Sequence, residues 1–161
     1  LRILRDILFH QNLGIGTDLN EGLRFLNQVM RRRAVVFLMS DFIIPEYDSD
    51  EESMENLLLK ELSTTRKKHD LVCCQIHDSL EKQLPPVGRV LFKDSETGER
   101  VMVNTSHEKF RSLYQKNNKL AQESFSRELR RRGIENFEFS TSSDYVKDLQ
   151  EFFHNRGSRR R

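Results

Sequence analysis

The sequence predicts an α/β domain, a three-layer Rossmann-like fold on a mostly parallel sheet. Residues 34–39 and 71–76 are continuous apolar runs rich in β-formers, which is typical of strands buried on both faces of a parallel sheet. Segments with helical periodicity separate these strands, an order that implies right-handed crossovers. Short alternating runs at 89–93 and 100–104 flank Gly98 and predict an inserted β-hairpin.

Length and composition fit one domain. The chain has 161 residues, of which 36% are hydrophobic, and this is enough for a single core and argues against wholesale disorder. The net charge of +2 is too small to mark a nucleic-acid-binding protein. We expect one domain over residues 1–156, followed by a frayed basic tail at 157–161.

The first half of the chain predicts three helices around the first strand. Residues 1–10 place Leu4, Ile7 and Leu8 on one stripe. A second helix begins at Thr17 or Asp18, and Asp18 with Glu21 matches a capping box. A third helix is expected at about residues 51–68, after an acidic stretch over 46–55.

The second half predicts a long helix, a third strand and a last helix. Thr105 with Glu108 matches a capping box for a helix that ends before Gly133, with Phe110, Leu113 and later apolar residues facing the core. A short strand follows at 136–139, and Thr141 is expected to cap the last helix.

The candidate site lies at the carboxyl ends of the predicted strands, where open parallel sheets bind ligands. Asp41 follows the first strand, and Thr17 begins the helix that leads into that strand. Both are therefore expected on the ligand face. A hydroxyl and a carboxylate are oxygen ligands of the kind Mg²⁺ accepts, although Thr17 could equally be a helix cap and Asp41 a turn residue. Ser40, His77 and Asp78 are expected at the rim of this site, where a turn role is the alternative for the last two.

Many short pieces of the sequence occur in the order found in a bacterial family. They include Gly16-Thr17-Asp18-Leu19, the run Val35 to Phe42, His69-Asp70-Leu71-Val72, Glu96-Thr97-Gly98, Arg132-Gly133-Ile134 and Phe152-Phe153. In these pieces the chain resembles the second half of the DUF fifty-eight family, whose uncharacterised members contain a von Willebrand factor A-like domain.

The resemblance implies a metal-ion-dependent adhesion site made of an Asp-x-Ser-x-Ser loop, a Thr and an Asp. Thr17 and Asp41 match the last two parts, while the first part has no match here, so we expect it upstream of Leu1. Mg²⁺ is then expected only in the intact protein, with little or no binding by these 161 residues. The missing strands would also leave the strand over 34–40 as an open edge, which predicts self-association.

The same resemblance implies a protein-binding role rather than an enzyme, beside a MoxR-type AAA+ ATPase in complex assembly. One alternative makes Asp41 the nucleophile of a phosphatase-like enzyme, but such enzymes need a second Asp two residues on, where this chain has Ile43. Another is nucleic-acid binding through arginine clusters such as Arg130–Arg132 and Arg159–Arg161. The chain has two cysteines, adjacent in sequence, and no apolar run of membrane-spanning length, from which we expect a cytoplasmic location.

Overall fold

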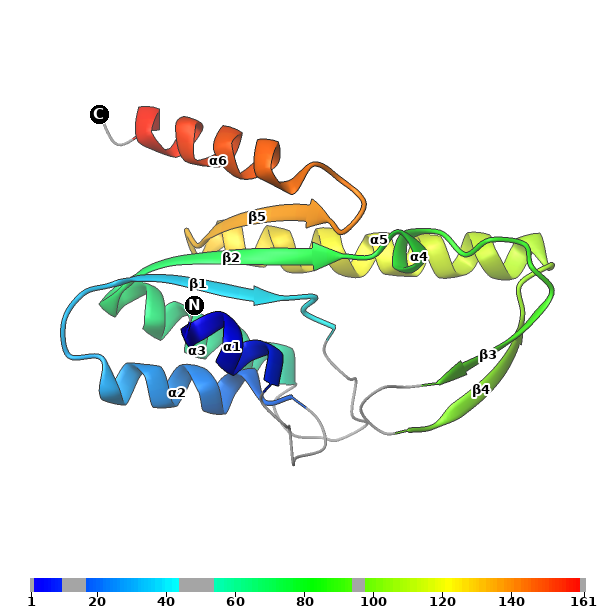
Figure 1. The fold of residues 1–161 in the computed structure, drawn as a ribbon, viewed down its shortest axis with the longest axis horizontal. Coiled ribbons are helices and arrows are strands. Elements are labelled where there is room, and N and C mark those ends of the chain that lie inside the picture. Colours follow the sequence, from blue (N-terminus) through cyan, green and yellow to red (C-terminus); the bar gives the residue numbers. More distant parts are fainter. Residues whose placement is uncertain (1, 10–16, 44–53, 94–97, 160–161) are drawn as a thin grey trace.

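The computed structural model describes residues 2–9, 17–43, 54–93 and 98–159. The elements in chain order are α1 (Arg2–Phe9), α2 (Leu19–Val29), β1 (Val35–Ser40), α3 (Met54–Lys68), β2 (Asp70–His77), α4 (Ser79–Lys82), β3 (Arg89–Lys93), β4 (Arg100–Asn104), α5 (Glu108–Arg131), β5 (Glu135–Ser140) and α6 (Tyr145–Arg159) (Figure 1). α6 therefore continues as helix through residues 157–159, where the sequence predicted the start of a tail.

A parallel sheet of three strands forms the centre of the molecule, in the order β1-β2-β5. β3 and β4 pair with each other in a separate antiparallel hairpin. These findings confirm the predicted α/β class, the parallel sheet and the inserted hairpin. Among the described strands β1 lies at one edge of the sheet, because it pairs only with β2.

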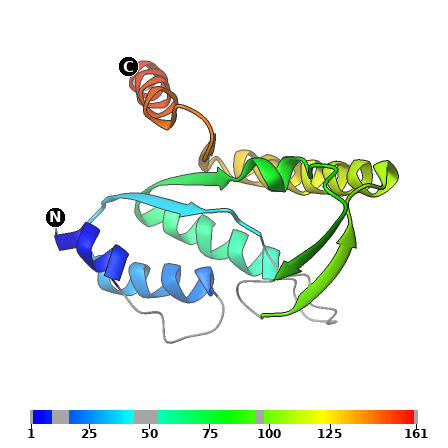
Figure 2. The same ribbon diagram turned by 45° about the vertical axis from the view of Figure 1, so that its right-hand side comes forward.

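One face of the sheet carries the main core. Side chains from α2, α3 and α5 pack there against alternate residues of β1 and β2; the buried ones include Leu23, Leu59, Leu62, Leu71, Cys73, Phe125 and Leu129. α6 covers the other face through aromatic contacts, with ring centroids 5.0 Å apart for Phe137 and Phe152 and 5.9 Å apart for Phe37 and Phe153. The three layers are thus helices, sheet and helix, as the views in Figures 1 and 2 show.

β1 is less buried than its sequence predicts. Val35, Phe37 and Met39 are 55%, 40% and 63% exposed, whereas almost every residue of β2 is buried. The prediction of burial on both faces is therefore correct for β2 and wrong for β1. α6 contacts this face of β1 through the ring pair of Phe37 and Phe153, and Val35 and Met39 on the same face remain more exposed than Phe37.

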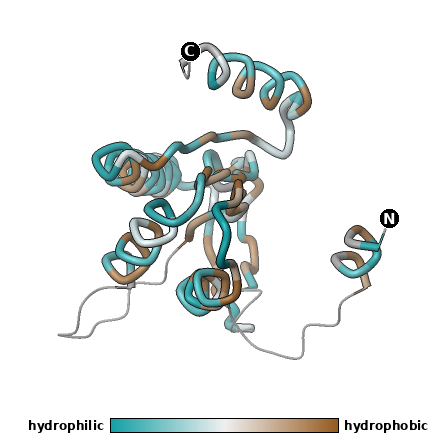
Figure 3. Tube along the Cα trace, turned by 90° about the vertical axis from the view of Figure 1, so that its left-hand side faces the viewer, coloured by the Kyte–Doolittle hydropathy of each residue, from teal (hydrophilic) through white to brown (hydrophobic). Residues whose placement is uncertain are grey.

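Two helices extend beyond this core. α5 has 24 residues and spans about 36 Å, while the eight residues of β2 span about 26 Å. The N-terminal part of α5 therefore extends past the end of the sheet (Figure 1). Leu113, in this part of α5, is exposed, although the sequence predicted that it packs in the core. α1 stands apart from the other elements in Figure 3, with Leu4 and Leu8 exposed.

Within the described ranges, no helix combines the length and the apolar character needed to cross a membrane.

Candidate functional site

The candidate site is the carboxyl edge of the parallel sheet. Because β1, β2 and β5 run parallel, their carboxyl ends meet at one edge, and polar residues follow all three strands. Ser40 is the last residue of β1 and Asp41 follows it. Asp78 follows β2, and a run of four hydroxyl residues, Ser140 to Ser143, begins at the last residue of β5. The topology that the site prediction required is therefore present.

Asp41 is exposed, and local hydrogen bonds fix its carboxylate. Its Oδ1 accepts from the hydroxyl of Ser40 at 3.3 Å and from the backbone N–H of Ile43 at 3.2 Å. Ser40 in turn accepts from the N–H of Phe42 at 3.0 Å. Asp41 thus takes part in a turn and is also exposed at the edge. The hydrogen bonds of the turn orient its exposed carboxylate.

Phe42 adopts a left-handed backbone conformation, with φ of 53°, which is unfavourable for a bulky residue. Its ring is buried and lies 5.0 Å from that of Phe125 on α5, so core packing maintains the strained turn. Residues held in such conformations cluster at functional sites. Asp41, directly before Phe42, is exposed.

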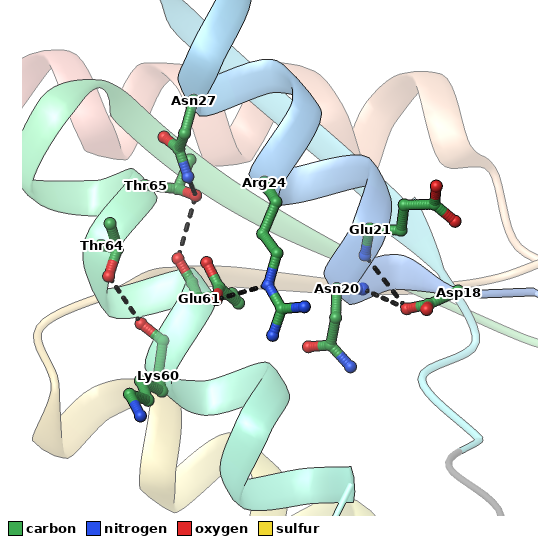
Figure 4. A network of polar contacts seen from close by, with 9 residues as sticks. All are labelled: Asp18, Asn20, Glu21, Arg24, Asn27, Lys60, Glu61, Thr64 and Thr65. Carbon is green, nitrogen blue, oxygen red and sulfur yellow. Dashed lines mark hydrogen bonds and ion pairs between the residues drawn. The ribbon is translucent and has the colours of Figure 1, made fainter.

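Thr17 is exposed just before the first turn of α2. In Figures 1 and 2 the N-terminus of α2 lies on the side toward which the carboxyl end of β1 points. The cap of this helix is Asp18, whose Oδ1 accepts from the backbone N–H groups of Asn20 at 2.8 Å and Glu21 at 3.1 Å (Figure 4). Since Asp18 caps the helix, that role does not account for the hydroxyl of Thr17.

Contacts between α2 and α3 hold this helix in place. The guanidinium of Arg24 donates to Glu61 at 2.9 Å, and the amide of Asn27 donates to the hydroxyl of Thr65 at 2.8 Å (Figure 4). Thr65 is fully buried, so the second bond stabilises more than the exposed ion pair. The position of Thr17 is therefore set by the packing of α2 on α3.

Asp78 takes part in the architecture of the edge. One carboxylate oxygen accepts from the backbone N–H of Leu80 at 2.8 Å, at the start of α4, and the other accepts from the hydroxyl of Thr141 at 3.3 Å. The backbone N–H of Thr141 also donates to the carbonyl of His77 at 3.0 Å. Asp78 thus joins the ends of β2 and β5. His77 is buried, with Nδ1 3.2 Å from the amide of Gln122 on α5, so its side chain packs inside rather than on the rim.

Two predicted caps near the edge are wrong. α6 begins at Tyr145, and Asp144 rather than Thr141 accepts from its first turn, through the N–H of Lys147 at 3.3 Å. Thr105 does not cap α5, whose N-cap is His107 without a side-chain bond. The hydroxyl of Thr105 instead binds the chain at the base of the hairpin. The run Ser140-Thr141-Ser142-Ser143 belongs to the edge, but only Thr141 was given a role from the sequence, as a helix cap. Four consecutive hydroxyl residues after a predicted strand are the sequence signal that indicates this part of the edge.

Thr17 and Asp41 offer oxygen donors of the right kind for Mg²⁺. Two ligands do not complete an octahedral site, and the described residues contain no group of three or more His, Cys, Asp or Glu side chains placed to hold a metal ion. Mg²⁺ would therefore need further ligands besides these two residues. If bound, it would supply open coordination positions for a partner's carboxylate.

The two cysteines are buried in β2, away from this edge. Burial, together with the neighbouring Cys74, raises the pKa of the Cys73 thiol to about 12, and burial also raises the pKa of Cys74. A thiol needs a lowered pKa to act as a nucleophile at neutral pH. Both cysteines therefore serve as small apolar core residues.

Taken together, the fold and the edge define an α/β protein with a parallel sheet, an inserted hairpin and a hydroxyl- and carboxylate-bearing carboxyl edge. A family described as protein of unknown function DUF58 matches residues 1–124. The chain belongs to this family. Among curated proteins and among solved structures, no match was found.

Proposed function

We propose that the chain is a protein-interaction module whose partner docks at the carboxyl edge of the parallel sheet. One observation carries the proposal. Asp41 is exposed at the end of β1, held in a fixed orientation by Ser40 and by the strained turn at Phe42. A carboxylate oriented in advance binds a partner with less loss of entropy than a mobile one.

The partner we propose is a MoxR-type AAA+ ATPase, in a complex-assembly role. Membership of the DUF58 family, together with the resemblance of Thr17 and Asp41 to two parts of a metal-ion-dependent adhesion site, supports this choice. These two side chains would contact Mg²⁺ or the partner itself. Recognition would then depend on Asp41 more than on any other residue of the edge, because it offers an exposed carboxylate.

An enzymatic role finds less support at this edge. A phosphatase-like mechanism needs a second carboxylate at position 43, and Ile43 occupies it. We therefore infer a binding module, not an enzyme.

The test is binding of the chain to a purified MoxR-type ATPase from the same organism, followed by biolayer interferometry with and without Mg²⁺. We expect Asp41→Ala to weaken binding by about tenfold or more, as truncating a charged anchor commonly costs about 2 kcal/mol. Thr17→Ala should weaken it less, because it removes a neutral group. Glu123→Ala is the control, since it removes an exposed carboxylate from α5 at 50% side-chain exposure. Binding that is equally affected by the Asp41 and Glu123 changes would refute the proposal.

A further inference from the structure

The β3–β4 hairpin is an element whose role the carboxyl edge does not explain. It forms its own two-stranded sheet and projects from the three-stranded sheet in both Figure 1 and Figure 2. Isolated two-stranded hairpins are marginally stable in water. This one is fixed at its base, where buried Thr105 donates to the carbonyl of Gly88 at 2.9 Å and accepts from the N–H of Val87 at 3.1 Å. The structure therefore maintains an element that contributes little to the core.

The register of the hairpin separates its two faces. Arg89 lies opposite Asn104, Leu91 opposite Met102, and Lys93 opposite Arg100. Residues directly opposite each other share a face, and side chains alternate along each strand. These six residues therefore form one face, which we call the basic hairpin face. Val90, Phe92, Val101 and Val103 form the other.

The basic hairpin face combines cations with an apolar centre. Leu91 and Met102 are exposed in the middle, and Arg89, Lys93 and Arg100 are exposed around them. Neither strand contains an acidic residue, although Asp94, Glu96 and Glu99 lie between the two strands in the sequence. Lys93 and Arg100 stand directly opposite each other, an arrangement of like charges that destabilises a sheet. An anionic group bound between them would remove this cost.

We propose that the basic hairpin face is a docking surface for an acidic protein segment with an apolar anchor. Carboxylates of the segment would pair with Arg89, Lys93 and Arg100, and its apolar side chain would cover Leu91 and Met102. Nucleic acid fits less well, because bases stack on aromatic rings and the one aromatic residue of the hairpin, Phe92, lies on the opposite face. The surface is separate from Asp41 and does not depend on the proposed role of the carboxyl edge.

The test uses fluorescence anisotropy with a short labelled peptide in which glutamates surround two leucines. We expect the wild-type chain to bind it with an affinity that falls as salt is added. The double change Lys93→Glu and Arg100→Glu should weaken binding on the order of tenfold, since it replaces two attractive charge pairs by repulsive ones. Its control is Lys116→Glu with Arg127→Glu, which reverses two exposed cations on α5 and should leave binding nearly unchanged.

A second pair of variants separates docking from loss of the hairpin itself. Met102→Ser and Val101→Ser change neighbouring residues of β4 that are 62% and 56% exposed but lie on opposite faces. Docking predicts that only the Met102 change weakens binding, whereas an unfolded hairpin would lose binding with either. Equal losses from the two changes, no salt-dependent binding by the wild-type chain, or tighter binding of single-stranded DNA or anionic lipid vesicles than of the peptide would each overturn the proposal.

Discussion

Single residues at the carboxyl edge are of two kinds: those whose side chains stabilise the fold and those whose side chains are exposed and could bind a partner. Asp78 and Asp18 use their carboxylates to hold backbone N–H groups, which is the common role of Asp beside a helix or turn. Asp41 also makes such a bond, yet its side chain is exposed, in a turn held by the buried ring of Phe42. Sequence patterns located all three residues. They correctly predicted the capping role of Asp18. They left the roles of Asp41 and Asp78 open, since these depend on contacts from other elements.

The buried thiol of Cys73 should make the fold sensitive to alkaline pH. Its pKa rises from 9.0 to about 12 on folding, so below about pH 9 the thiol is neutral in both states and contributes no pH dependence. Above that pH the unfolded chain releases a proton that the folded chain retains. The free energy of unfolding should therefore fall as pH rises, by up to about 1.4 kcal/mol per pH unit from this group.

Urea unfolding at about pH 8 and about pH 10, on both sides of the ordinary thiol pKa, measures this effect. Because other groups titrate in the same range, the informative comparison is with Cys73→Ala, whose stability should decline less steeply between the two pH values. Parallel declines in the two proteins would contradict the prediction.

At the scale of the elements, local signals placed most helices and strands correctly, and tertiary contacts reassigned several residues. The hairpin strands have the predicted limits, because alternation and Gly98 act locally. Gly133 adopts the predicted left-handed conformation after α5, with φ of 64°. Thr105 fits a local capping pattern but closes the base of the hairpin through Val87 and Gly88, and no local pattern reveals that partnership.

Thr105 should therefore matter to stability through its hydroxyl. Replacing it by Val keeps its volume but removes both hydrogen bonds of the buried hydroxyl, while the Gly88 carbonyl and the Val87 N–H each keep a backbone hydrogen bond. We expect Thr105→Val to lower the free energy of unfolding by about 1 to 3 kcal/mol. Thr105→Ser keeps the hydroxyl and should lose clearly less. Chemical denaturation measures both changes, and equal losses would assign the effect to packing instead.

At the scale of the whole molecule, β1 is an edge strand of the described sheet and one of its faces is largely exposed. Val35 and Met39 expose apolar side chains on an edge strand, and such edges recruit other strands. We therefore expect the chain to self-associate through residues 34–40. Sedimentation velocity over a range of concentrations should show a dimer or larger species.

A charge on the edge should prevent this association. Met39→Lys should shift the chain toward monomer, because a lysine on an edge strand opposes strand addition. Leu113→Lys places the same charge at an exposed position of α5 and should leave association unchanged. A wild-type chain that stays monomeric at every concentration would contradict the expectation.

The sequence by itself determined the class of the fold, the order of its elements and the candidate residues at strand ends, because apolar periodicity, glycines and capping residues act over a few positions. Tertiary structure decided which faces are covered. It left β1 half open, carried α5 past the sheet, turned His77 inward and assigned Thr105 to the hairpin. The physical reason is that burial and hydrogen-bond partners come from segments distant in the chain, so they follow only from how the elements pack.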